Sequence, residues 1–187
     1  MESLMIDMDD VIVRGGFLYL INEYLGTSYI EEDIKGYYMQ DMIPEEAKAD
    51  FWNWFFSGKN MYDHCEMLPN AYEVIEELNK VYKICISTAY IFPERPRESG
   101  KVLIQKFNYL MDNLPFLTPQ NYAFIMDKSL INCKIKIDDR IDNLAIAERK
   151  LMFTAYHNKD IENKFLQQRG VDRANDWLDV KKILLKK

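Results

Sequence analysis

Short apolar runs and helical periodicities alternate along most of this chain. Five brief runs rich in apolar side chains are typical of buried strands: residues 4–6, 81–86, 122–125, 135–137 and 151–154. Apolar residues recur every three or four positions between them, which predicts amphipathic helices around residues 17–25, 71–78, 103–114, 144–147 and 177–184. Strands that alternate with helices predict a doubly wound, mostly parallel, Rossmann-like α/β sheet.

Residues 30–68 interrupt this alternation. They contain no strand pattern, and their aromatic residues fall at helical spacing, as in Phe51, Trp54 and Phe55. A length of 187 residues corresponds to one main domain with room for a modest insertion. The sequence therefore predicts an α/β domain with a helical segment inserted after its first strand.

Composition and charge narrow the class of protein. The net charge of −6 argues against nucleic acid and anionic membranes as partners, and no apolar stretch reaches eighteen residues. The first residues lack the pattern of a signal peptide, which favours a cytoplasmic protein. The three cysteines have no metal-ligand spacing, and the two histidines, His64 and His157, stand alone, so we expect no zinc site and structural roles for both histidines.

Polar side chains follow four of the predicted strands at or near the point where each strand ends: Asp7 and Asp9, then Thr88, then Lys128, then Asp138 and Asp139. Ligands of a doubly wound sheet bind beyond the carboxyl ends of its strands. We therefore expect these groups to meet in one crevice.

The chemistry of the set is that of phosphoryl transfer. Asp7 can attack phosphorus, and Asp9, two residues further along an extended chain, can give a proton to the leaving oxygen and later activate water. Asp138 and Asp139 offer the hard oxygen ligands that Mg²⁺ prefers. Two groups remain to hold the phosphate, namely the hydroxyl of Thr88 and the ammonium of Lys128.

Each of these residues also has an ordinary explanation. Acids after a strand are common, a threonine at a strand exit is unremarkable, and a lone lysine in a loop is usually solvated. The order and the chemistry of the whole set together favour Mg²⁺-assisted phosphoryl transfer to an aspartate.

The order Asp7-x-Asp9, Thr88, Lys128, Asp138-Asp139 resembles the four motifs of the haloacid dehalogenase (HAD) superfamily. Further stretches resemble its 5′(3′)-deoxyribonucleotidases: residues 59–62, 68–71, 127–129, 137–139, 152–158 and 175–177. The resemblance implies that Asp7 is the nucleophile and that Asp9 is the acid/base, with its backbone carbonyl on Mg²⁺. It also implies phosphate binding by Thr88 and Lys128, and metal binding by Asp7 and by one or both of Asp138 and Asp139.

The resemblance further implies two parts, an α/β core of residues 1–13 and 69–187 and a helical cap of residues 14–68. Aromatic cap residues of the family stack on the nucleobase, which makes Tyr37, Tyr38 and Trp52 candidates for substrate contacts. Asp10 and Lys134 depart from residues that relatives often have, as does the stretch 13–16. These departures do not affect the residues expected to carry out the phosphatase reaction. They leave the identity of the substrate and the preferred base open.

The sequence therefore predicts a Mg²⁺-dependent phosphatase for deoxyribonucleoside monophosphates, a small-molecule partner. Two alternatives stay open: a HAD phosphatase for another small phosphate such as a sugar phosphate, and a metal- and phosphate-binding regulatory protein of low turnover. The oligomeric state is also open, and a homodimer is one candidate.

Overall fold

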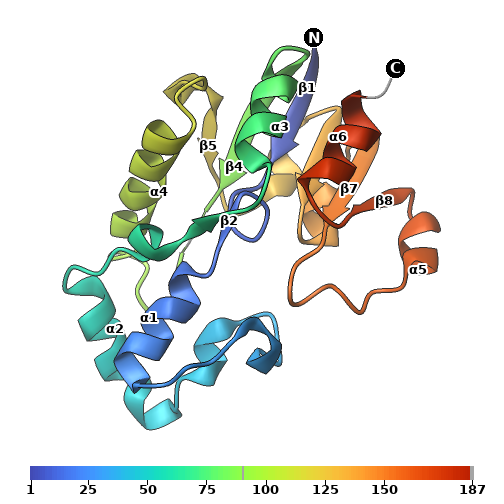
Figure 1. The fold of residues 1–187 in the computed structure, drawn as a ribbon. Coiled ribbons are helices and arrows are strands. Elements are labelled where there is room, and N and C mark those ends of the chain that lie inside the picture. The colour runs from blue at the N-terminus through green and yellow to red at the C-terminus, as the bar shows by residue number, and fades with distance from the viewer. Residues whose placement is uncertain (90, 186–187) are drawn as a thin grey trace.

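A six-stranded parallel sheet forms the centre of the molecule (Figure 1). The computed structural model describes residues 1–89 and 91–185. Across the sheet, the strands follow the order β5 (Tyr122–Phe124), β4 (Tyr82–Thr88), β1 (Glu2–Ile6), β6 (Ile135–Asp138), β7 (Arg149–Phe153) and β8 (Val171–Ala174). The predicted fold class is confirmed.

The first strand lies inside the sheet. Leu4 pairs with Ile84 of β4 on one side and with Ile135 of β6 on the other. Leu4, Met5 and Ile6 have no exposed surface, because elements cover both faces of the sheet. The residue that follows β1 is therefore delivered to the middle of the carboxyl edge.

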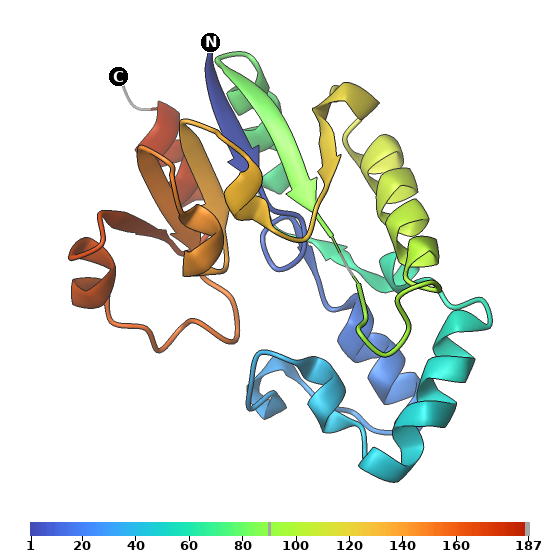
Figure 2. The same cartoon turned by 180° about the vertical axis from the view of Figure 1, so that it is seen from behind.

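Helices pack against this sheet. On one face, α3 (Ala71–Asn79) and α6 (Trp177–Leu185) lie side by side, while α4 (Gly100–Asn113) runs alongside β5 (Figures 1 and 2). Trp177 is completely buried, and its indole N–H donates a 2.8 Å hydrogen bond to the carbonyl of Val11. The last helix thus holds the loop that follows β1.

The sequence pattern did not predict two elements beyond β7, the helix α5 (Asn163–Gln167) and the strand β8. Strand β8 is an edge strand with the sequence Val-Asp-Arg-Ala, in which only Val171 and Ala174 are buried. Because it contains no continuous apolar run, its sequence gives no strand signal. The helix predicted around 144–147 is a 3₁₀ helix, η7 (Ile141–Leu144).

The face that α4 presents to the core also differs from the prediction. The fully buried residues of this helix are Val102, Lys106 and Leu110. The apolar face that the sequence predicts for this helix consists of Leu103, Phe107, Leu110, Met111 and Leu114. Of these, Leu103 and Phe107 are only half-buried, and Met111 is exposed. A lysine therefore occupies an inward position.

A two-stranded antiparallel ribbon of β2 (Val13–Arg14) and β3 (Glu66–Met67) brackets the inserted segment. Between these strands lie α1 (Gly16–Leu25), α2 (Lys48–Phe56) and the 3₁₀ helices η1 (Glu31–Asp33), η2 (Met39–Met42), η3 (Glu45–Ala47) and η4 (Met61–His64). The segment sits beyond the carboxyl edge of the sheet (Figures 1 and 2). Its description as a separate cap domain of residues 14–68 stays a prediction.

Within residues 1–89 and 91–185, no helix is long and apolar enough to cross a membrane. Cys65, Cys85 and Cys133 are free thiols. The cytoplasmic location stays a prediction.

Candidate active site

Asp7 follows β1 directly and is almost completely buried. Its backbone N–H donates to the carbonyl of Ile137, which fixes it between β1 and β6. Its carboxylate Oδ1 accepts a 2.6 Å hydrogen bond from the N–H of Met8 and lies 2.6 Å from the ammonium of Lys128. Burial raises the pKa of Asp7 to about 6, against the lowering influence of Lys128.

Asp138, the last residue of β6, has no exposed surface. Its Oδ1 accepts hydrogen bonds of 2.9 Å from the backbone N–H of Arg140 and from the side-chain amide of Asn143. Its Oδ2 lies 2.9 Å from the ammonium of Lys128. Burial raises the pKa of Asp138 to about 6.

Asp139 points into the same space from the loop after β6. The imidazole Nε2 of His157 lies 2.6 Å from its Oδ2, a hydrogen bond in which the ring N–H donates to the carboxylate. The buried amide of Asn158 donates to the Asp139 carbonyl and to the carbonyl of Phe153, tying the loops after β6 and β7 together. Burial raises the pKa of Asp139.

The carboxylates of Asp7, Asp138 and Asp139 form a donor set for a metal ion. One oxygen of each lies within 4.8 Å of the others, and all three residues are buried. The pKa of Lys128 is raised: burial alone would lower it, but Asp7 and Asp138 outweigh that effect. Three buried carboxylates beside this ammonium leave an excess of negative charge that a hard cation could offset.

Asp9 receives hydrogen bonds on both carboxylate oxygens. The Tyr62 hydroxyl donates to Oδ1 at 2.7 Å, while Oδ2 accepts from the Lys106 ammonium and, at 3.4 Å, from the Thr88 hydroxyl. The predicted site residues Asp9 and Thr88 are thus neighbours, although they are 79 positions apart in sequence. Sequence reasoning assigned no site role to Tyr62 or Lys106. The available signals were the family resemblance of residues 59–62 and a lysine on the apolar face of its helix.

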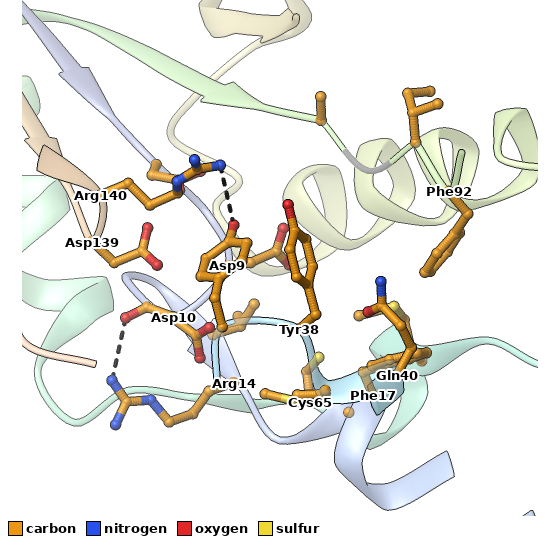
Figure 3. A pocket seen from close by; sticks show the side chains of 18 of the residues that line it. Asp9, Asp10, Arg14, Phe17, Tyr38, Gln40, Cys65, Phe92, Asp139 and Arg140 are labelled. Carbon is orange, nitrogen blue, oxygen red and sulfur yellow. Dashed lines mark hydrogen bonds between the residues drawn. The ribbon is translucent and has the colours of Figure 1, made fainter. Parts of the chain in front are cut away.

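A cavity of about 270 Å³ opens beside these carboxylates and extends toward the inserted segment. Figure 3 shows Asp10, Asp139 and Arg140 on one side of it, Phe17, Gln40 and Phe92 on the other, and Tyr38 between them. One end is therefore charged, and the other combines flat aromatic faces with one side-chain amide.

Tyr37 lines the same cavity and contacts the core at several points. The Arg140 guanidinium lies 4.7 Å from its ring centroid, and the ring packs edge-on against His157 at 4.9 Å. Tyr156 donates from its hydroxyl to the Tyr37 carbonyl at 2.7 Å. The loop that carries Tyr37 is thereby fastened next to Asp139.

Trp52 does not line the cavity. It is 4 % exposed, and its ring stacks on Phe17 and lies 4.3 Å from the ring of Phe92. Trp52 shares the buried face of α2 with Phe51 and Phe55, so its place is inside the inserted segment. Of the three predicted substrate contacts, only Tyr37 and Tyr38 face the cavity.

The parallel sheet, with carboxylates at the ends of β1 and β6 and a lysine from the loop after β5, defines a hydrolase of the HAD type. Solved structures share this fold. A HAD family hydrolase from Deinococcus radiodurans with bound phosphate and sodium matches with a TM-score of 0.61 and 12% identity, over 98% of this chain and 95% of that one. A haloacid dehalogenase-like hydrolase from Streptococcus pneumoniae matches with a TM-score of 0.51 and 15% identity, over 98% of each chain.

Residues 2–187 match the family model described as "5' nucleotidase, deoxy (Pyrimidine), cytosolic type C protein". The chain belongs to this family and is a phosphatase of the 5′(3′)-nucleotidase type. It is 30% identical to a Staphylococcus epidermidis protein named "Putative 5'(3')-deoxyribonucleotidase", over 96% of this chain and 94% of that one. It is 29% identical to the 5'(3')-deoxyribonucleotidase of Clostridium acetobutylicum, over 86% and 81% of the two chains.

Proposed function

We propose that the protein hydrolyses deoxyribonucleoside monophosphates in a Mg²⁺-dependent reaction that passes through an aspartyl-phosphate on Asp7. The observation that carries the proposal is the two-ended cavity, in which buried carboxylates and Lys128 adjoin aromatic rings and the amide of Gln40. A phosphate suits the first end and a nucleobase the second, because a base offers a flat face for stacking and polar edges for an amide. The names of the relatives point to the same substrate class.

The reaction follows from the placement of two carboxylates. Asp7 attacks phosphorus, and the bond between phosphorus and the nucleoside oxygen breaks. Asp9 gives a proton to this departing oxygen. Water then attacks the same phosphorus and gives a proton to Asp9, and the bond to Asp7 breaks to release phosphate. Lys128 stays protonated and faces the developing negative charge.

The donor set fits Mg²⁺, which prefers carboxylate oxygens. Asp7, Asp138 and Asp139 would hold it, together with the backbone carbonyl of Asp9. When bound, the ion supplies positive charge that neutralises the phosphate. Phosphate contacts from Thr88 and Lys128 and base contacts from Tyr37 and Tyr38 belong to the same proposal, as does a small-molecule nucleotide, rather than a nucleic acid, as the partner.

The test is phosphate release from a panel of deoxyribo- and ribonucleoside monophosphates and sugar phosphates, with Mg²⁺ or with EDTA. We expect Mg²⁺-dependent release from deoxyribonucleotides that Asp7→Asn abolishes, because an amide cannot form the acyl phosphate. Asp172→Asn, an exposed aspartate of β8, is the matched control and should keep full activity.

Release from sugar phosphates alone would contradict the nucleotidase assignment and favour the first alternative. No release from any substrate, together with measurable Mg²⁺ and phosphate binding, would favour the regulatory protein. Acid-quenched protein carrying covalent phosphate, absent in Asp7→Asn, is the result expected for the aspartyl-phosphate.

A further inference from the structure

Lys106 is a fully buried lysine in the middle of α4. Its ammonium donates hydrogen bonds to the carboxylate of Asp9, to the Thr88 hydroxyl oxygen at 2.6 Å and to the carbonyl of Ala89 at 3.3 Å. Burying a lysine is costly unless its charge and its three N–H groups are paired. The acceptors of this ammonium come from the ends of β1 and β4, so its side chain joins the two strand ends that carry Asp9 and Thr88.

The other oxygen of Asp9 is held from the inserted segment. Tyr62 of η4 is 4 % exposed, and its hydroxyl donates to Oδ1 at 2.7 Å. The Lys106 ammonium also lies 5.9 Å from the centroid of the Tyr62 ring. Since donors from separate elements hold both oxygens, the Asp9 carboxylate is fixed in position and in rotation.

Lys106 acts on Thr88 as well. Because an ammonium can only donate, its contact occupies a lone pair of the hydroxyl oxygen, and the hydroxyl hydrogen must point elsewhere. The hydroxyl can then donate to Asp9 or to an oxygen of a bound phosphate. One side chain thereby orients both the acid/base and the hydroxyl expected to bind phosphate.

We propose that Lys106 and Tyr62 are positioning residues for the proton transfers of Asp9, an inference that rests on the function proposed above. In the first step, the proton passes from Asp9 to the nucleoside oxygen as the P–O bond breaks. In the second, it passes from water to Asp9 as the bond between Asp7 and phosphorus breaks. Lys106 and Tyr62 keep their own protons throughout and determine where the carboxylate meets the reacting oxygen.

The test compares two leaving groups. A nucleoside oxygen needs a proton in order to depart, whereas p-nitrophenolate departs without one. We measure kcat/KM, which covers the steps up to phosphorylation of Asp7, for the best deoxyribonucleotide and for p-nitrophenyl phosphate. A displaced acid can lower a rate by about 100-fold.

We therefore expect Lys106→Met to lower kcat/KM for the nucleotide by about 100-fold, and for p-nitrophenyl phosphate by only a few-fold. Tyr62→Phe removes one hydroxyl, and we expect the same selectivity with a smaller loss; this variant keeps the test available if Lys106→Met does not fold. Lys101→Met is the matched control, because Lys101 lies on the same helix and contacts the carbonyl of Phe56, not Asp9.

Equal losses on both substrates, or no loss, would overturn the inference while leaving the phosphatase proposal intact. A wild-type protein without activity on any phosphate would instead overturn the proposed function itself. In an Asp9→Asn background, Lys106→Met should add little further loss on the nucleotide, because it acts through Asp9. Independent losses in that background would also contradict the inference.

Discussion

His157 is a single residue whose contact reaches the proposed metal site. Its ring donates to Asp139 at 2.6 Å and packs against Tyr37. Groups that orient metal ligands in this way typically change metal affinity by roughly 10–100-fold when they are removed. We predict that His157→Phe, which keeps a ring and removes the donor, raises the Mg²⁺ concentration for half-maximal activity by about that factor.

The measurement is a Mg²⁺ titration of phosphate release, in which saturating Mg²⁺ should restore most of the rate. His64→Phe is the matched control, because the exposed His64 stacks on Tyr19 and is not among the residues that line the cavity. An unchanged Mg²⁺ requirement in His157→Phe would show that the contact only supports packing, which is the structural role that the sequence favoured.

At the residue scale, the sequence predicted the groups that stand at strand ends. Asp7, Lys128, Asp138 and Asp139 converge because parallel strands bring their carboxyl ends to one edge. The sequence could not predict groups from helices and loops, because their positions depend on packing between distant segments. Tyr62 and Gln40 are of this kind, and Lys106 could have been noticed only as a charge on an apolar helix face.

At the scale of the elements, a glycine allows α1 and η4 to pack closely against each other. A Cβ on Gly16, the first residue of α1, would lie 2.1 Å from the carbonyl oxygen of Met61 and 2.6 Å from Sγ of Cys65. The two elements touch so closely only because residue 16 has no side chain. Since η4 carries Tyr62, this contact also determines where the Tyr62 hydroxyl meets Asp9.

We predict that Gly16→Ala lowers the free energy of unfolding by about 1–3 kcal/mol, the usual effect of an overpacked contact. The same change should lower nucleotide turnover, because it pushes Tyr62 away from Asp9. Urea denaturation and phosphate release measure the two effects. Gly100→Ala at the start of α4 is the control, since its Cβ would meet no atom within 4 Å, and its stability should change by less than about 0.5 kcal/mol. A Gly16→Ala protein as stable as the control would contradict the close contact.

The order of elements was predictable wherever apolar periodicity marked them. The five predicted strands all lie in the sheet, whereas the polar edge strand β8 and the short helix α5 gave no such signal. In the inserted segment, the sequence predicted a helix at 17–25, which is α1, and helical spacing in the region of α2, but not the four 3₁₀ helices. Trp52 shows the same limit, because an aromatic ring looks alike in a sequence whether it faces a cavity or a core.

At the scale of the whole molecule, the proposed metal site links the stability of the fold to the ion. Asp7, Asp138 and Asp139 repel one another in the folded protein, and they are separated when the chain unfolds. A cation that binds only the folded form stabilises it by about 2.7 kcal/mol at a hundred times its Kd. We therefore predict that Mg²⁺ stabilises the wild-type protein against urea by about this amount at that concentration.

The control variant is Asp138→Asn, which removes one charged donor and should gain much less from Mg²⁺. NaCl at the same ionic strength serves as the control for screening. Equal stabilisation by NaCl, or an undiminished gain in Asp138→Asn, would contradict a specific metal site.

The first strand and the last helix place both ends of the described chain at the amino edge of the sheet (Figures 1 and 2). The cavity lies at the opposite, carboxyl edge, beside Asp7 and Asp139. A support, a dye or a second protein attached through either end would therefore stand on the far side of the sheet from the cavity. The molecule can be immobilised through either end with its reactive side directed into solution. Single-molecule or surface-based assays of turnover can therefore attach the protein through either end without changing the residues around the cavity.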